Sequence, residues 1–158
     1  MGGGVPGGQA RRRGRLRRTG HGPELARSPG VSGVDAASRT LGITVESVGP
    51  GRARLRMRVT ADMVNGHGLA HGGYVFLLAD AAFDRACNCG GPLTLAQSAQ
   101  VTFVRPVMPG DELVAEATER VRYGRHGVYD VTVSRPSGQI VAEFRGQSIT
   151  LPRTSCTS

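Results

Sequence analysis

The chain contains 158 residues with a formal net charge of +8, and none of its apolar runs approaches the ~20 residues that cross a bilayer. The length predicts a single domain with a buried core, and the short apolar runs argue against a transmembrane helix. Seven Arg and one Glu in residues 1–31 carry +6 of the charge, so the remaining residues are nearly balanced and nucleic acid is not an expected partner.

Both ends of the chain differ in composition from its middle. Residues 1–33 are rich in Gly, Arg and Pro with few large apolar side chains, which predicts a flexible tail. A polyanion-binding arm is the functional alternative for residues 11–18, but no aromatic residues are interleaved with these arginines. Residues 152–158 form a short C-terminal tail, so the expected domain occupies residues 34–151.

The cysteines argue against a metal site. Cys87, Cys89 and Cys156 make an odd number without the paired spacing of a zinc site. Their pattern indicates reduced thiols, and no hydrophobic segment follows the N-terminal arginines, so a cytoplasmic protein is expected.

The first part of the domain predicts one short helix and two strands. Residues 34–41 are expected to form a helix that ends at Gly42, and residues 43–48 alternate like a strand. Residues 52–59 alternate strictly, with arginines facing solvent and apolar side chains facing the core. This arginine row is either an anion-binding stripe or the wet face of a strand, and the second interpretation is favoured.

A polar, Gly-rich loop at residues 65–73 leads into an apolar helix that ends at Cys87. Residues 75–78 cover every side of one turn, which is typical of a helix buried all round. Asp80 is the one carboxylate in the middle of this segment, and an unpaired buried charge is costly, so it is kept either for a structural hydrogen bond or for chemistry. Gly72 and Gly73 let another group approach the first free N–H groups of the helix, where negative charge is favoured. Together these features suggest acyl chemistry.

After the helix the pattern changes to strands at residues 93–105, 110–121, 128–135 and 140–151, which we expect to form a four-strand meander. One helix against a consecutive antiparallel sheet is an α+β, two-layer design. The helix has more apolar surface than one such sheet covers, so a partner chain is expected.

A family resemblance is carried by motifs that occur in order along residues 34–151. They are Asn65-Gly66-His67, His71-Gly72-Gly73, Leu78-Ala79-Asp80, Ala86-Cys87-Asn88, Phe103-x-Arg105-Pro106, Gly110-Asp111, Gly127-Val128-Tyr129-Asp130 and Phe144-Arg145-Gly146. This series resembles the PaaI-type hotdog acyl-CoA thioesterases.

The resemblance implies a hotdog fold, an antiparallel sheet wrapped around one long central helix. It implies hydrolysis of phenylacetyl-CoA or hydroxyphenylacetyl-CoA in phenylacetate catabolism. No cofactor is implied, since coenzyme A is part of the substrate, and the assembly would be a dimer of hotdogs paired into a homotetramer. By position, Asp80 matches the catalytic carboxylate and Gly72 the backbone oxyanion donor, while Asn65 and His71 match polar residues of the active-site loop. Cys89 replaces the Ser that often follows Asn88 in the family.

The spacing of two of these residues has a geometric consequence. At 1.5 Å per residue, Gly72 and Asp80 lie ~12 Å apart along one helix, too far to serve the same thioester carbonyl. Two antiparallel helices from two chains bring each Asp80 to the other chain's Gly72, so the spacing predicts a symmetric dimer with two shared sites. Asp80 would activate a water or attack directly to form an anhydride, and the sequence does not choose between these. Asn65 would orient the water or the carbonyl.

The acyl and CoA contacts are less specific. Gly73 lies beside the oxyanion donor, and Ser98 or Gln100, on the strand after the helix, is expected to reach the acyl pocket. The phosphates of CoA call for arginines at the mouth of the site. The candidates are Arg105, Arg122, Arg125 and Arg145.

Two other functions remain open. A hydratase or dehydratase would pair a carboxylate with a catalytic His, but no His follows Asp80 until His126. An acyl-CoA-binding regulatory module would bind without turnover. His67 and His71 have the i, i+4 spacing of zinc ligands, but they lie on a Gly-containing loop, where bracing the loop or orienting substrate is the expected role.

Overall fold

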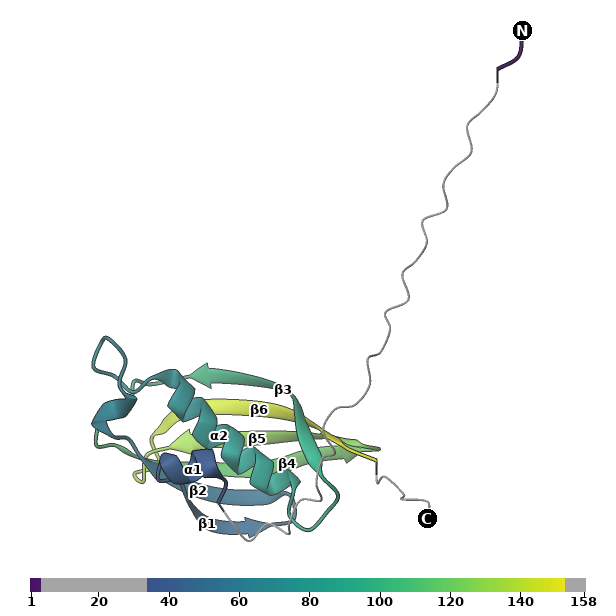
Figure 1. Ribbon diagram of the computed structural model, residues 1–158. Helices are drawn as coiled ribbons and strands as arrows, with labels where there is room; N and C mark the ends of the chain where they lie inside the picture. The colour runs from purple at the N-terminus through teal and green to yellow at the C-terminus, as the bar shows by residue number, and fades with distance from the viewer. Residues whose placement is uncertain (4–33, 153–158) are drawn as a thin grey trace.

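A six-stranded antiparallel sheet curls around one long helix, α2 (Gly72–Cys87), in the computed structural model of the chain (Figure 1). The structure describes residues 1–3 and 34–152. The two tails expected at residues 1–33 and 152–158 fall almost wholly outside these ranges. The other elements are α1 (Ala36–Thr40), β1 (Thr44–Gly49), β2 (Arg52–Arg58), the 3₁₀ turn η1 (Ala61–Met63), β3 (Thr94–Phe103), β4 (Glu112–Tyr123), β5 (His126–Ser134) and β6 (Ile140–Thr150).

The strand order in the sheet is β1-β2-β4-β5-β6-β3. The expected four-strand meander is therefore wrong at its first strand, because β3 pairs with β6 at the far edge and β4 pairs with β2. The segment between β3 and β4 makes the crossing. Its Val104 N–H donates to Val141 O at 2.8 Å, and further along Gly110 N–H donates to Val59 O at 2.7 Å. Residues on both sides of the crossing are thereby tied to other strands. Only β4, β5 and β6 form a meander.

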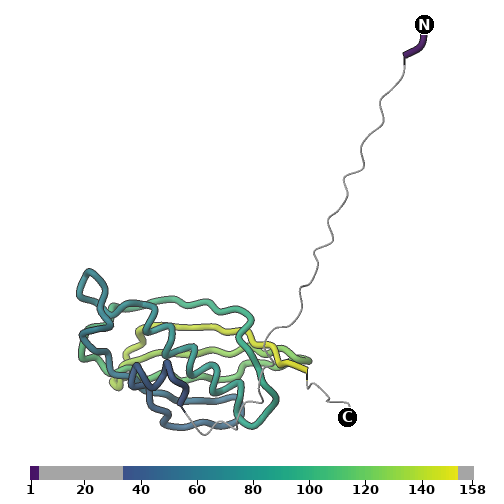
Figure 2. The backbone as a smooth tube through the Cα atoms, in the orientation of Figure 1, coloured from purple at the N-terminus to yellow at the C-terminus, as the bar shows by residue number. Residues whose placement is uncertain are grey.

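The crossing segment also meets the start of α2. Ala70 N–H, two residues before the helix, donates to Val107 O at 2.8 Å. The backbone trace accordingly leaves β3 at the same end of the molecule as the loop that precedes α2 (Figure 2). This end of the fold carries the candidate site.

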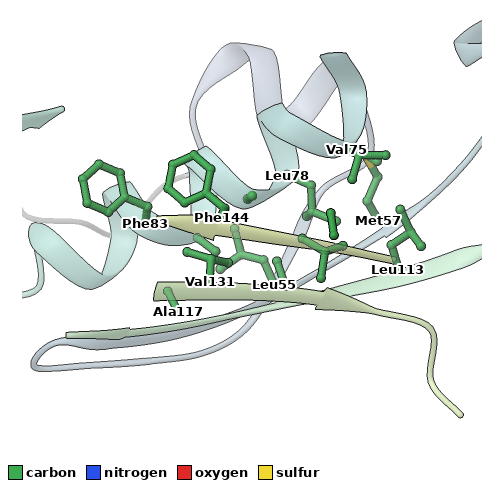
Figure 3. Close-up of a cluster of buried hydrophobic side chains, with 14 of the residues drawn as sticks. Leu55, Met57, Val75, Leu78, Phe83, Leu113, Ala117, Val131 and Phe144 are labelled. Atoms are coloured by element: carbon green, nitrogen blue, oxygen red, sulfur yellow. The ribbon is translucent and has the colours of Figure 1, made fainter. Parts of the chain in front are cut away.

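The core lies between α2 and the inner face of the sheet (Figure 3). The Phe83 ring packs edge-on against Tyr129 of β5, with 5.4 Å between centroids, and lies tilted against Phe144 of β6, with 5.7 Å between centroids. The run of apolar residues predicted a helix buried all round, but α2 is not. One flank remains half-buried in the single chain, at Tyr74, Phe76, Leu77 and Ala81. An apolar flank of this kind is what the expected partner chain would cover.

The arginine row of β2 is the solvated face of a strand, as favoured from the sequence. Ala53, Leu55 and Met57 are buried, while Arg54 and Arg56 both pair with Glu46 on β1 at 2.6 Å. The same two arginines also pair with Glu116 and Glu112 on β4. Acids of the same sheet therefore hold the guanidinium groups of Arg54 and Arg56, which makes these two side chains unavailable to an anion.

The short first helix is also confirmed. Asp35 caps α1, because its carboxylate accepts from Ser38 N–H at 2.9 Å, and Gly42 follows the helix with a φ of 65°. In the described part of the chain, no helix is long and apolar enough to span a bilayer.

Candidate active site

The loop before α2 is built around the side chain of Asn65. The amide oxygen of Asn65 accepts from the N–H groups of His67 at 2.9 Å and Leu69 at 3.3 Å. These bonds occupy the oxygen and fix the plane of the amide. The NH₂ group of Asn65 has no acceptor among the described residues, so it is free to donate to a ligand.

His71 caps the N-terminus of α2. Its Nδ1 accepts from Gly73 N–H at 3.1 Å, which places the ring hydrogen on Nε2. The ring is exposed and lies edge-on to Tyr74, with 6.5 Å between centroids. The structure thus gives His71 a helix-capping contact, and it engages the Gly73 amide that was expected to meet substrate.

Gly72 is left with the free amide. Its N–H is in the first turn of α2 and has no acceptor in residues 1–3 or 34–152, as the helix geometry requires of such positions. A Cβ at this position would lie 2.9 Å from Cζ of Phe103, so the aromatic ring packs directly on the glycine. The helix therefore presents a donor of partial positive charge beside an aromatic wall.

A cleft of about 440 Å³ opens beside this amide. Its walls are mainly apolar, formed by Leu69, Ala70, Val75, Phe103, Val104, Pro106, Val107 and Val141, while Asn65, Gly72 and Arg105 add polar groups. The exposed Arg105 side chain is anchored by a 2.7 Å hydrogen bond from Nη1 to Ile140 O. The arrangement can hold an apolar group next to the Gly72 amide and the Asn65 side chain.

Asp80 lies further along α2, one turn from both Phe76 and Phe83. It is half-buried, and its carboxylate has no hydrogen bond or ion pair among the described residues. Burial raises the pKa of this carboxyl above the ordinary value of 3.8, and the negative charge of Asp84 raises it further. A partly desolvated carboxylate without a donor has the properties of a base or nucleophile.

One chain does not bring Asp80 and Gly72 together. Asp80 is not among the residues that line the cleft, and eight residues of helix separate it from Gly72. The rise of an α-helix makes that separation ~12 Å, as expected from the sequence. Within one chain, the donor and the carboxylate therefore do not form a single site.

The structure corrects the placement of Ser98 and Gln100. Val101 and Phe103 point toward α2, so the alternation of β3 turns these two polar residues to the outer face of the sheet. Gln100 accordingly lines a polar hollow on that face with Arg145 and Glu143. Neither residue faces the cleft beside Gly72 in this chain. The prediction failed because alternation defines two faces of a strand without indicating which one packs on the helix.

The arginines predicted to contact CoA differ in whether they reach the cleft. Arg105 reaches the cleft, whereas Arg122 binds Glu119 at 2.8 Å and Arg145 binds Asp130 at 2.7 Å. The latter two guanidinium groups are held by acids of their own sheet. Arg105 is therefore the better-placed of the predicted CoA contacts.

Sequence reasoning missed two contributors. The ring of Phe103 lies over Gly72, and the shared face of Phe103 and Val101 was the available signal. The carboxylate of Asp84 influences Asp80, and its i+4 position on the predicted helix would have revealed it. The roles of Val107 and Val141 in the cleft depend on the crossing segment, which no local pattern predicted.

The buried Cys87 thiol is not a candidate for the nucleophile. Burial raises the pKa of the Cys87 thiol to about 12, so it stays protonated at neutral pH. Cys87 and Cys89 are both free, as predicted, and Cys156 lies outside the described residues. No group of three or more metal-ligating side chains occurs in residues 1–3 or 34–152.

Comparisons with known proteins agree with this geometry. Residues 67–142 match the Thioesterase superfamily. The chain is 43% identical over 114 residues to the acyl-coenzyme A thioesterase PaaI of Escherichia coli strain K12, an alignment that covers 72% of this chain and 81% of that relative.

Solved structures give the same result. The E. coli PaaI protein from the phenylacetic acid degradation operon superposes with a TM-score of 0.73 at 42% identity, covering 75% of this chain and 86% of that one. The TT0310 protein of Thermus thermophilus superposes with a TM-score of 0.72 at 37% identity, covering 75% of this chain and 99% of that one.

Proposed function

The chain belongs to the PaaI acyl-CoA thioesterases of the thioesterase superfamily, and we propose that it hydrolyses phenylacetyl-CoA or its hydroxylated relatives to the free acid and CoA. It is a hotdog-fold thioester hydrolase, and the proposal concerns the acyl group and the residues that act. One observation carries the assignment of the site. A helix with an unpaired amide beside an apolar cleft also bears a half-buried carboxylate that has no partner of its own among the described residues.

The Gly72 amide would bind the thioester oxygen. That oxygen gains negative charge as the carbonyl carbon becomes tetrahedral, and a fixed N–H donor at a helix N-terminus stabilises the charge. The free NH₂ of Asn65 lines the same cleft and supplies a second donor. Gly73 does not supply a donor, because its N–H is bonded to Nδ1 of His71.

Asp80 of a second chain would complete the site. In a dimer with α2 helices side by side and antiparallel, each Asp80 approaches the Gly72 amide of the other chain. The half-buried flank of α2 and the unpaired edge of β3 are the surfaces that such a dimer would cover. Two dimers would then assemble into a tetramer.

The chemistry requires no cofactor. Asp80 either removes a proton from a water that attacks the carbonyl carbon, or attacks it directly to give an anhydride that water then hydrolyses. In both routes the C–S bond breaks and CoA leaves as a thiolate, which takes up a proton. The thiolate is a good leaving group, so no strong general acid is needed.

The cleft supports an aryl substrate. Its walls carry the aromatic ring of Phe103 and several aliphatic side chains, which suit a flat apolar group. Arg105 at its edge is placed to meet a phosphate of CoA. The phenylacetic acid degradation operon that encodes the E. coli relative agrees with this choice and with a role in phenylacetate catabolism.

The test measures release of the CoA thiol from phenylacetyl-CoA, 4-hydroxyphenylacetyl-CoA and a series of linear acyl-CoAs. We expect the highest kcat/KM with the aryl substrates and loss of most turnover in Asp80→Asn, with retained acyl-CoA binding. Asp62→Asn, which changes an exposed carboxylate on η1, is the control and should turn over normally. Preference for linear chains would overturn the acyl assignment, and full activity of Asp80→Asn would remove Asp80 from the mechanism.

The same assay separates the other two functions. A binding module would hold acyl-CoA with no thiol release by the wild-type chain. A hydratase would add water to an enoyl-CoA without releasing thiol.

A further inference from the structure

We propose that Asp84 is a positioning residue for the hydrolysis, placing a second fixed negative charge one helical turn from Asp80 and so setting the pH range in which Asp80 acts. The inference rests on the function proposed above for Asp80. It concerns a residue that neither the cleft nor the oxyanion site includes.

The first step is position. Asp80 and Asp84 are at i and i+4 on α2, so their Cβ atoms lie about 6 Å apart on one side of the helix. Both side chains lie on the flank of α2 away from its buried stripe. Two like charges at this spacing disfavour each other's ionised form.

The second step is that Asp84 is held in place. Nδ2 of Asn88 donates to Oδ1 of Asp84 at 2.9 Å and also to Thr94 O at 3.0 Å. Oδ1 of Asn88 accepts from Thr94 N–H at 2.9 Å. Asn88 therefore joins the end of α2 to the start of β3 and fixes the Asp84 carboxylate at that junction.

The third step is that the described residues place no compensating charge near Asp80. On the faces of β3 and β6 that turn toward α2, the paired residues Ala99, Val101, Phe144 and Gly146 do not titrate. Arg85 and Asp35 act on Asp84, and neither contributes to the pKa of Asp80. In the proposed dimer, the loop of the second copy adds the imidazoles of His67 and His71.

The charge of Asp84 has a consequence for Asp80 as a base. A carboxylate that is harder to ionise is a stronger base once ionised, and its function begins at a higher pH. Burial and then Asp84 both raise the pKa of Asp80, so both move the acid limb of the rate profile upward. Without the charge on Asp84, Asp80 should ionise at lower pH and act as a weaker base.

The test is the pH dependence of kcat/KM for phenylacetyl-CoA in wild type, Asp84→Asn and Asp84→Glu. Asparagine keeps an oxygen that accepts from Asn88 while it removes the charge, so the fold and the junction remain. We expect the acid limb of Asp84→Asn to move to lower pH, with a lower plateau rate above it. Glutamate restores the charge and should return the limb toward the wild-type position.

Salt supplies a second readout that a structural role would not affect. The coupling between two partly exposed charges is screened, so the difference between wild type and Asp84→Asn should shrink as NaCl rises from about 20 mM to about 1 M. Wild type and the variant both retain His67 and His71, so a shift between them belongs to residue 84.

The outcomes are distinct from those of the proposed function. Superimposable profiles for wild type and Asp84→Asn, with Asp80→Asn inactive, would overturn this proposal and leave the function intact. Wild-type turnover by Asp80→Asn would overturn the role of Asp80 and this inference with it. Asp84→Ala serves as a second charge-free variant, and a profile that follows wild type there would also count against the proposal.

Discussion

Asp80 occupies a position where its charge disfavours folding. Its carboxylate is half-buried with no donor among the described residues, and its pKa is raised by burial and by Asp84. Asp111 is the contrasting case in the same fold. Hydrogen bonds from Arg135 and from Met108 N–H lower the pKa of Asp111, so its ionised form favours the native state. Two aspartates of one chain thus have opposite effects on stability.

Substituting these two residues should change the thermal stability in opposite directions. A raised native pKa means that the native state binds protons more tightly than the unfolded state, so Asp80 destabilises the fold once pH exceeds the ordinary value of 3.8. Asp80→Asn should therefore raise Tm at pH 7, and the gain should vanish as pH falls below that ordinary value. Thermal melts followed by circular dichroism at several pH values measure this. A lower Tm for Asp80→Asn at pH 7 would contradict it.

Asp111→Asn is the matched control. Its ionised form stabilises the native state above its ordinary pKa, and that contribution is lost as pH falls through the lowered native value. The variant should melt below wild type at pH 7, and the difference should close in strong acid. If both variants shift in the same direction at neutral pH, the contrast drawn from their surroundings fails.

The positions of Gly72 and Asp80 on one helix were predictable because their signals are local. A carboxylate in an apolar helix and a glycine pair at its start are visible within sixteen residues, from Gly72 to Cys87. The inward turn of Phe103 was not predictable, since alternation defines two faces of β3 and only the contact with Gly72 identifies the inner one. The same ambiguity led to the expectation that Ser98 or Gln100 reaches the acyl pocket.

At the scale of elements, α2 depends on how its first turn is capped. His71 accepts from Gly73 N–H through Nδ1, and the loss of such a cap costs ~1 kcal/mol. His71→Ala should therefore lower the free energy of unfolding by about that amount. Asparagine is a strong N-cap without an imidazole, so His71→Asn should recover most of it. Denaturant unfolding of the three proteins gives the comparison.

The activity of these two variants then identifies what the ring does. If His71→Asn is as stable as wild type and equally active, the imidazole is only a cap. If it is stable but slower, the Nε2 hydrogen contributes to substrate orientation, which was the role expected from the loop position. Equal stability of His71→Ala and wild type would refute the capping contact itself.

In the sheet, the strand bounds were predictable from the sequence but the strand pairing was not. The strands were predicted within a few residues of their bounds because each alternates, and the solvated arginines of β2 followed from the same pattern. The neighbour of β3 was not predictable, because a strand's alternation carries no information about its partner. The crossing segment is held by bonds to residues far away in sequence, such as Val104 N–H to Val141 O. That segment also supplies four of the eleven residues that line the cleft.

At the scale of the whole molecule, one chain keeps the two proposed half-sites, the Gly72 amide and the Asp80 carboxylate, apart and leaves one flank of α2 half-buried. The Gly72 amide has a cleft but no carboxylate nearby, and Asp80 has no donor among the described residues. A dimer that places each beside its counterpart would satisfy both, and it would bury the half-exposed apolar side chains of α2 at the same time. Shared sites of this kind can be tested by mixing inactive chains.

Hybrid dimers should recover activity that neither parent has. Proline at position 72 removes the amide donor, and the extended backbone of His71, with ψ 129°, tolerates a following proline. Because a Cβ there meets the Phe103 ring at 2.9 Å, the variant should combine Gly72→Pro with Phe103→Ala. Mixed equally with Asp80→Asn, it forms hybrids in half of the dimers, each with one intact site, so about a quarter of wild-type thiol release is expected. Adding Asp80→Asn to the proline chain removes the last intact site and should abolish the recovery. Verified subunit exchange without any gain would mean that the two half-sites do not meet across chains.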